Sequence, residues 1–295
     1  CDGIIAIGGG SVLDTAKGIG IVTMNGGHIL DYEGVDTVAV PMPPLICIPT
    51  TAGSAADVSQ FAIITDTRRR TKVAIISKAI VPDVALVDPC TLKSLPADLT
   101  AATGMDVLAH AVEAYVSLAS SPLTAVHALE AARLITQALP QAVASPLHAE
   151  ARNQTMLASL HAGMAFSNAS LGAVHALAHS LGGFLDLPHG ECNALLLPAV
   201  VAFNFPAAPQ KFRRLAQTIG LNLSGMDDTT AATAFEEHLK TLRTTLGIHG
   251  GLADRGLRPE DLAHLTAIAA QDPCLITNPR PTTTTDLEAI YARIL

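Results

Sequence analysis

The sequence predicts an α/β region followed by an all-helical region, and two observations support this division. Short apolar runs separated by glycine and proline fill residues 1–97. Long Ala- and Leu-rich segments with apolar residues three or four apart fill residues 98–295. The first pattern is typical of strands joined by turns, and the second is typical of helices that bury one face. Because 295 residues exceed one average domain, we expect two domains, divided between residues 97 and 98.

The α/β region begins with an expected strand at Gly3–Ile7, which three consecutive glycines at residues 8–10 close. The segment Ser11–Ile21 then has helical spacing, with Ser11 as the expected N-cap. Pro and Gly separate the later apolar runs, as in short strands joined by turns. Those runs predict strands at Thr37–Val40, Leu45–Ile48, Phe61–Ile64, Lys72–Ile76 and Val84–Val87.

The helical region contains nine segments in which apolar residues recur at helical spacing. The last of them follows four consecutive threonines at residues 282–285, and Asp286 is placed for its first turn. The expected helices are Thr100–Ala119, Pro122–Ala138, Leu147–Ser167, Ala173–Leu185, Ala194–Phe203, Gln210–Ile219, Thr229–Leu246, Pro259–Ala270 and Asp286–Ile294.

The composition excludes several classes of protein. The chain has 18 Lys and Arg against 26 Asp and Glu, a formal charge of −8, whereas a nucleic-acid binder needs clustered basic residues to neutralise phosphates. With 49% apolar residues, the chain has ample material for a core, which argues against disorder. Its mean hydropathy is +0.39, yet no segment has the roughly 18 unbroken apolar residues of a spanning helix. We therefore expect a large, Ala-rich buried core and neither a nucleic-acid nor a membrane partner.

The cysteines indicate the compartment. There are five of them, beginning with Cys1, and they are scattered and form no C-x-x-C pair. This usage favours a reducing cytoplasm. The chain also begins without Met or a signal peptide and enters its first expected strand almost at once. We interpret it as a fragment whose natural N-terminus is missing.

Two turns of the α/β region have the features of a nucleotide site. The glycines at residues 8–10 precede a helix, so close backbone approach, free N–H groups and the positive end of a helix dipole meet at one point. The spacing lacks the third glycine of the G-x-G-x-x-G fingerprint, so a plain strand-to-helix turn is an alternative. A second turn, at residues 49–54, follows another apolar run and offers hydroxyl groups. Ligands bind at the carboxyl ends of strands in α/β sheets, so the two turns together favour a nucleotide.

Five residues of the helical region form a second candidate site. Asp106 and His110 are four apart on one expected helix, and His175 and His179 are four apart on another. Each pair therefore projects from one helix face. His189 follows ten residues later, and the neighbours of all five are almost entirely apolar. A buried carboxylate and several imidazoles need partners, and one divalent cation satisfies them together.

The alternative is that each histidine, taken singly, caps a helix or bonds to a core carbonyl. The pairing at a spacing of four favours the metal site. One carboxylate with two or three imidazoles suits Fe²⁺, Zn²⁺ or a similar ion, and the ligand types do not choose between them.

Several short motifs follow one another along essentially the whole chain. They are Gly8-Gly9-Gly10-Ser11 with Asp14-Thr15-Ala16-Lys17, Pro49-Thr50-Thr51-Ala52-Gly53, Gly104-Met105-Asp106, His110-Ala111 with Glu113-Ala114-Tyr115, His175, His179, Pro188-His189-Gly190 with Cys192-Asn193-Ala194, and Thr277-Asn278-Pro279-Arg280. In this order they resemble the motifs of the iron-containing (group III) alcohol dehydrogenase family. The ordered set is highly specific, although any one motif is ambiguous.

The resemblance implies a dehydroquinate-synthase-like fold. Residues 1–97 would form a partial dinucleotide-binding α/β domain, residues 98–295 an all-helical metal-binding domain, and the active site would lie in the cleft between them. It further implies that His179 faces cofactor and substrate without binding the metal, which makes it the candidate catalytic residue. The implied metal ligands are Asp106, His110, His175 and His189. The implied cofactor-binding residues are Gly9, Gly10 and Ser11 at the pyrophosphate, Thr50, Thr51 and Ser54 near the nicotinamide, and Lys72.

The resemblance also implies an activity. A metal-dependent oxidoreductase would transfer a hydride between a primary alcohol or small diol, or the aldehyde, and NAD or NADP. Family habit implies a homodimer or larger homo-oligomer. Phe166, Phe184 and Cys274 are candidates for the substrate pocket. The alternatives are a relative of the same fold, such as a glycerol dehydrogenase or maleylacetate reductase, or a non-catalytic fragment of a larger aldehyde–alcohol dehydrogenase.

The family pattern differs from this sequence at its start. Family members have further strands and helices before the glycine turn. We expect a chain without them to bind dinucleotide weakly, because one sheet edge and part of the adenosine wall are then uncovered.

Overall fold

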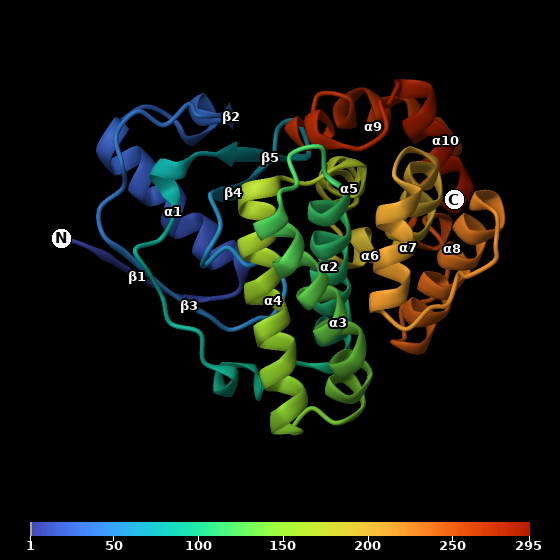
Figure 1. Cartoon of the computed structure of the whole chain (residues 1–295). Coiled ribbons are helices and arrows are strands. Elements are labelled where there is room, and N and C mark those ends of the chain that lie inside the picture. The colour runs from blue at the N-terminus through green and yellow to red at the C-terminus, as the bar shows by residue number, and fades with distance from the viewer. Residues whose placement is uncertain (1) are drawn as a thin grey trace.

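The computed structural model describes residues 2–295. Cys1, which is one of the five cysteines counted above, lies outside the described residues. Within those residues the strands all lie before Leu86, and the helices from Ala97 onward make up the rest of the chain. Figure 1 shows the strand-bearing part beside the helical part, with α2, α3 and α4 between the strands and the C-terminal helices. The predicted fold class, an α/β region followed by an all-helical region, is confirmed.

The described strands form two three-stranded sheets. In the first sheet β3 lies between β1 and β6, and both pairings are parallel. In the second sheet β5 lies between β2, which is parallel to it, and β4, which is antiparallel. The strands are β1 (Ile4–Gly8), β2 (Gly34–Val35), β3 (Leu45–Pro49), β4 (Phe61–Asp66), β5 (Thr71–Ile76) and β6 (Val84–Ala85).

The pairing of β1 with β3 brings the two expected ligand turns together. Ile4 pairs with Leu45 and Gly8 with Pro49, so the two strands end at the same edge of the sheet. The glycine turn and the turn at residues 49–54 therefore leave this edge side by side, as expected for one nucleotide site.

The first helix, α1 (Gly10–Asn25), packs on β1 and β4. It buries Leu13 and Ile21 among the apolar residues of the sheets. Lys17 is fully buried, and its amine donates hydrogen bonds of 2.7 Å to the carbonyls of Ser59 and Phe61. A buried ammonium is stable only with such partners, so Lys17 fixes α1 to the segment that enters β4.

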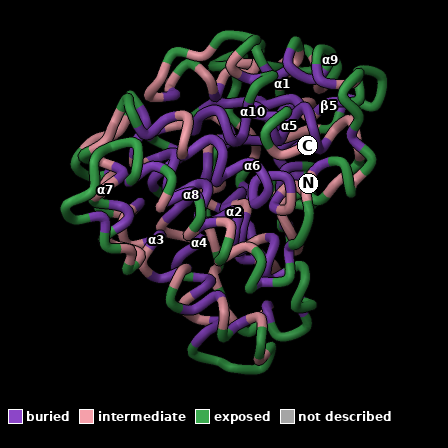
Figure 2. The backbone as a smooth tube through the Cα atoms, turned by 90° about the vertical axis from the view of Figure 1, so that its right-hand side faces the viewer, coloured by how far each residue is buried: buried purple, intermediate pink, exposed green. Residues whose placement is uncertain are grey.

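The remaining helices surround a central one. Fifteen of the twenty residues of α2 are buried, because α3, α4 and α6 pack around it. Figure 2 shows this buried centre in purple. The helices are α2 (Ala97–Val116), α3 (Pro122–Ala144), α4 (Ala149–Ala169), α5 (Ala173–Leu185), α6 (His189–Asn204), α7 (Pro209–Thr218), α8 (Asp228–Thr245), α9 (Leu262–Ala269) and α10 (Thr284–Ile294). Among residues 2–295, no helix combines the length and apolar character needed to cross a bilayer.

Two predictions in the α/β region are wrong. Gly9, not Ser11, is the N-cap of α1, because the extended Gly9 already presents its carbonyl to the amides of Val12 and Leu13. The expected strand at Thr37–Val40 does not form, since the side chain of Asn25 bonds to both the N–H and the carbonyl of Val40. The strand that forms just before this segment is β2, which pairs in parallel with β5.

Helices α6 and α10 both begin earlier than predicted, although the expected place of Asp286 in the first turn of α10 is confirmed. Helix α6 starts at His189, five residues before the expected Ala194. Its first turn carries polar side chains, which hid the helix from a search for apolar spacing. In α10, Thr283 is the N-cap, and Asp286 completes a capping box in the first turn, which confirms the expected place of Asp286.

Candidate metal centre and cofactor cleft

A cavity of about 530 Å³ lies where the two turns of the first sheet face the central helices. This volume is in the range of small-molecule sites. The cavity is lined by the predicted cofactor residues Gly9, Gly10, Ser11, Thr51, Ser54 and Lys72, and by Asp106, His110, His175, His179 and His189. Thr50 is the one predicted cofactor residue that does not line it. Its N–H instead bonds to the carbonyl of Gly8, 2.9 Å away, and ties the two turns together.

The start of α1 gives the cavity a wall of backbone amides. No side chain caps this helix, so the positive end of its dipole faces the cavity at Gly10 and Ser11. The two turns also pack too closely for larger residues. A Cβ on Gly9 would lie 3.2 Å from Thr51 Cγ2, and one on Gly10 would lie 2.7 Å from Ser54 Oγ. This wall is suited to the phosphates of a dinucleotide.

Three helices supply the candidate metal ligands. Asp106 and His110 project from one face of α2, His175 from the first turn of α5 and His189 from the first residue of α6. The Asp106 Oδ1 atom lies 3.8 Å from His110 Nε2, 3.6 Å from His175 Nε2 and 3.9 Å from His189 Nε2. The ligand atoms of Asp106, His110 and His175 all lie within 4.8 Å of one another.

This spacing fits a divalent cation. Distances of 3.6 to 3.9 Å are too long for hydrogen bonds between carboxylate and imidazole. Four ligands bound tetrahedrally at ~2.1 Å would be separated by about 3.4 Å, which is close to the observed distances. Asp106, His110 and His175 are at most 4% exposed, and a carboxylate so buried requires a compensating charge.

The electrostatics of the centre agree with this assignment. Burial alone would raise the pKa of Asp106, but the imidazoles of His110, His189 and His175 outweigh burial and hold that pKa below its usual value. Burial lowers the pKa of His110 to about 4 and that of His189 well below its usual value. Both rings are therefore neutral at pH 7 and offer a lone pair to a cation.

His175 behaves differently. Burial would lower the pKa of His175, but the nearby carboxylates of Asp106 and Glu113 outweigh burial and raise it to about 9. A proton is therefore retained beside Asp106 at neutral pH, in the place where a cation would supply positive charge. Cation binding at such a centre releases a proton.

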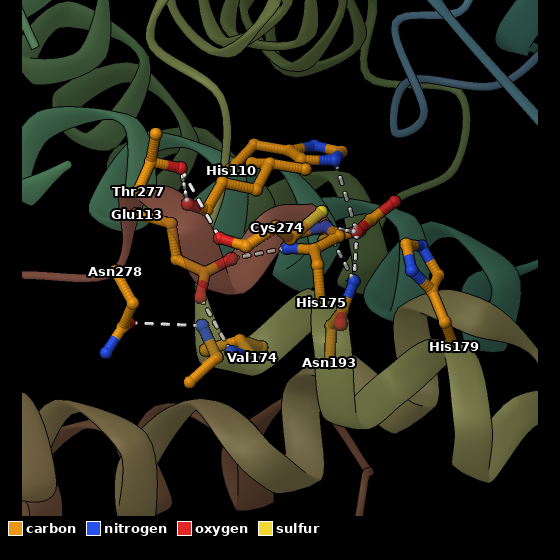
Figure 3. A network of polar contacts seen from close by, with 12 residues as sticks. His110, Glu113, Val174, His175, His179, Asn193, Cys274, Thr277 and Asn278 are labelled. Atoms are coloured by element: carbon orange, nitrogen blue, oxygen red, sulfur yellow. Dashed lines mark hydrogen bonds and ion pairs between the residues drawn. The ribbon is translucent and has the colours of Figure 1, made fainter. Parts of the chain in front are cut away.

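Three polar residues next to the ligands were missed in the sequence. Figure 3 shows Glu113 on one side of the His175 ring and Asn193 on the other. The Asn193 Nδ2 atom donates to Asp106 Oδ1 at 2.6 Å. Asp272 Oδ2 lies 2.7 Å from His179 Nδ1. Each of these contacts joins residues far apart in the chain, so no sequence spacing reveals it.

His179 lies in the wall between two cavities. It lines the cleft described above and also a second cavity of about 960 Å³ between β5 and α9. Its ring stacks on that of His189 with the ring centroids 5.3 Å apart. Because His179 Nδ1 donates to the Asp272 carboxylate, Nε2 is the ring nitrogen that remains to meet a ligand. This position beside the candidate metal ligands is consistent with the expected catalytic role.

The candidate substrate residues lie in different places. Phe166 lines the cleft and stacks on His110 with the ring centroids 4.3 Å apart. Phe184 lines the second cavity, where the Arg70 guanidinium lies 4.8 Å from its ring centroid. Cys274 is fully buried and lines neither cavity. Phe166 is therefore the only one of the three that meets the cleft.

Comparison with known proteins agrees with the geometry. Residues 1–89 match the family described as iron-containing alcohol dehydrogenase, and residues 100–295 match the C-terminal part of the Fe-containing alcohol dehydrogenase family. The chain is 42% identical to an NAD-dependent methanol dehydrogenase of Bacillus methanolicus, over 100% of this chain and 77% of that protein.

Solved structures give the same result. A crystal structure of 1,3-propanediol oxidoreductase matches with a TM-score of 0.95 and 41% identity, over 100% of this chain and 77% of that one. Sulfoacetaldehyde reductase from Bifidobacterium kashiwanohense, in complex with NAD⁺, matches with a TM-score of 0.85 and 33% identity, over 100% of this chain and 76% of that one.

Proposed function

Because the chain belongs to the iron-containing alcohol dehydrogenase family, a family of oxidoreductases, we propose that it interconverts a primary alcohol or small diol and the aldehyde. The hydride acceptor is NAD or NADP, and the metal is Fe²⁺, with Zn²⁺ as a substitute of the same ligand preference. Residues 1–97 serve the dinucleotide and residues 98–295 hold the metal.

One observation carries the proposal. The buried carboxylate of Asp106 faces three imidazole Nε2 atoms at 3.6 to 3.9 Å, and these groups line the same cavity as the amide wall of α1. A metal centre and a phosphate-binding helix start in one cleft would bring a Lewis acid to the substrate oxygen and a nicotinamide to the adjacent carbon.

The metal would be held by Asp106, His110, His175 and His189. When bound, a divalent cation supplies Lewis acidity that lowers the pKa of an alcohol hydroxyl and polarises an aldehyde carbonyl. The chain excludes water around these groups, because Phe166 and the apolar faces of α2 and α5 enclose them. Exclusion of water strengthens every electrostatic interaction in the cleft.

Other residues orient the reactants and move the proton. Oxidation removes a hydride from the alcohol carbon and a proton from its hydroxyl. The amides of Gly10 and Ser11 and the hydroxyl of Ser54 bind the dinucleotide, and Lys72 binds it from β5. His179 accepts the hydroxyl proton at Nε2, and Asp272 holds the ring by its Nδ1.

The test is a metal and substrate analysis of the anaerobically purified protein. Metal-depleted samples are reloaded with Fe²⁺ or Zn²⁺ and assayed with methanol, 1-propanol and 1,3-propanediol, each with NAD and NADP. We expect turnover that depends on bound metal. His175→Ala and His189→Ala lose metal and turnover together, whereas His249→Ala, at an exposed histidine, keeps both. Full turnover by a variant that holds no metal refutes the proposal.

Assembly is a separate part of the proposal. We expect a homodimer or larger homo-oligomer, as in the family. Light scattering of the purified protein measures the assembled mass directly, and a monomer at micromolar concentration contradicts this part alone.

A further inference from the structure

Glu113 is a buried carboxylate that the proposed function does not use. It lies on α2, is 3% exposed, and has no Lys or Arg partner among residues 2–295. Its Oε2 atom is 2.5 Å from His175 Nδ1, and its Oε1 accepts a hydrogen bond of 2.7 Å from the N–H of Val174. Figure 3 shows the carboxylate between these two partners.

Both partners of Glu113 are donors. A carboxylate is an acceptor only, so the short contact with His175 requires the ring proton to be on Nδ1. In the form that binds a cation, Nε2 then carries the lone pair on the other side of the ring, where Asn193 Nδ2 lies 3.1 Å away and Asp106 Oδ1 3.6 Å away. A histidine that binds a cation through Nε2 needs this tautomer.

Glu113 also fixes the helix that carries His175. The N-cap of α5 is Gly172, which has no side chain, and the first two amides of the helix are capped from elsewhere. Asn278 Oδ1 accepts from Ala173 N at 3.1 Å, and Glu113 Oε1 accepts from Val174 N. The close packing is visible at Gly172, because a Cβ there would lie 2.9 Å from Glu113 Oε1. One carboxylate therefore contacts both the His175 ring and the first turn of the helix that carries it, and Asn278 supplies the other cap.

We propose that Glu113 is a positioning residue of the metal centre, which holds His175 in the tautomer and orientation that bind the cation and ties both to the start of α5. This inference rests on the proposed function, since it assumes that His175 is a metal ligand. Partners that orient a ligating histidine typically change metal affinity by about 10- to 100-fold when removed.

The informative variant is Glu113→Gln, which keeps the size of the side chain. Glutamine has one acceptor atom for two donors, so it cannot satisfy both. If its oxygen faces Val174 N, its NH₂ group meets the ring nitrogen and favours the opposite tautomer of His175. If its oxygen faces His175, the start of α5 loses a cap and meets a second donor.

The measured quantity is the Zn²⁺ dissociation constant, obtained by competition with a chromophoric chelator. We expect Glu113→Gln to raise it about 10- to 100-fold. Glu236→Gln is the matched control. Glu236 is a buried glutamate on α8 that pairs with Lys240 and Arg293 and lines neither cavity. Its variant should lose stability without any change in Zn²⁺ affinity.

A purely structural role gives a different result. Glu113→Gln would then unfold at a lower temperature but bind Zn²⁺ as tightly as the wild type, and the proposal would be wrong.

A measurement on the wild type keeps the test valid if the variant does not fold. In the Zn²⁺-loaded protein with ¹⁵N-labelled histidine, the His175 resonances should show the proton on Nδ1, and a proton on Nε2 refutes the inference. Failure of the proposed function looks different. In that case the wild type binds no Zn²⁺ at the centre, or His189→Ala binds it unchanged.

Discussion

Gly190 is the position where one methyl group should disable the metal centre without unfolding the chain. It is the second residue of α6 and follows His189 directly. A Cβ at this position would lie 2.3 Å from the carbonyl oxygen of Ala102 and 2.7 Å from its carbonyl carbon. Both atoms belong to the backbone of α2, so no side-chain rotation relieves the contact.

The size of the disturbance follows from these distances. Ordinary contacts between heavy atoms begin near 3.5 Å, so Gly190→Ala must separate the start of α6 from α2 by about 1 Å. His189 moves with its neighbour, and its Nε2 is already 3.9 Å from Asp106 Oδ1. Metal sites tolerate errors of only about 0.2 Å in ligand distances. His189 is therefore lost as a ligand, and we expect metal affinity to fall at least about 100-fold.

Stability should change much less than affinity. Overpacking a buried contact lowers the free energy of unfolding by about 1–3 kcal/mol, and replacing a helical glycine by alanine raises it by about 0.5–1 kcal/mol. The variant should thus stay folded, with a modestly lower urea midpoint in the metal-depleted form. Bound metal per chain and the Zn²⁺ dissociation constant are measured on the same preparation.

Gly18→Ala in α1 is the control for this experiment. A Cβ at Gly18 would lie 3.5 Å from Ile29 Cδ1, which is an ordinary contact. We expect Gly18→Ala to leave the metal affinity unchanged and to raise the free energy of unfolding by up to about 1 kcal/mol. If Gly190→Ala retains wild-type metal affinity, the argument from close packing is wrong.

Three further predictions concern other sites. Burial raises the pKa of Asp14 from its ordinary value of 3.8 to about 6, although the positive charge of Lys17 opposes this shift. The native state therefore binds this proton more tightly, and its stability falls as pH rises from about 4 to about 6. Asp14→Asn should raise the free energy of unfolding by up to about 3 kcal/mol at pH 7.5 and by almost nothing near pH 4. An equal effect at the two pH values, measured by urea titration, would contradict this prediction. Arg152→Met should lower the free energy of unfolding in urea by about 2–4 kcal/mol. The reason is that the buried guanidinium donates hydrogen bonds to the carbonyls of Leu95 and Pro146 and to the Thr100 hydroxyl. A decrease of less than about 0.5 kcal/mol would count against this prediction. His179→Ala should keep its metal by elemental analysis but lose about 10²- to 10⁴-fold in turnover; loss of the metal would instead make His179 a ligand.

The sequence predicted most elements of the fold because their apolar spacing is undisturbed. The α5 helix begins and ends at the predicted residues, Ala173 and Leu185. The α6 helix was predicted to begin five residues late, since its first turn contains His189, Cys192 and Asn193. His189 and Asn193 face the metal centre, and only Cys192 of the three packs in the apolar core, against α5. Periodicity fails at this helix start because the site requires polar residues there.

The candidate metal ligands could be predicted from the sequence, whereas the residues that contact them could not. A spacing of four residues reveals both Asp106 with His110 and His175 with His179, whereas the resemblance to a family decides which of these residues are the expected ligands. The partners Glu113 and Asp272 have no such signal, because their contacts join residues 62 and 93 positions apart. A contact between helices depends on how the helices cross, and that depends on packing over the whole region.

The small residues of this chain connect its composition to the metal centre. A Cβ on Gly104, two residues before Asp106, would lie 2.3 Å from Leu139 Cδ1 on α3. The methyl-sized side chains of Ala101, Ala109 and Ala111 are fully buried on α2. Glycine and alanine let neighbouring helices approach α2 closely enough for ligands on α2, α5 and α6 to face one another. The many small apolar residues therefore allow close helix packing around buried polar ligands. Gly104→Ala should weaken metal binding less than Gly190→Ala, because its contacts are with the Leu139 side chain, which can move, and not with backbone.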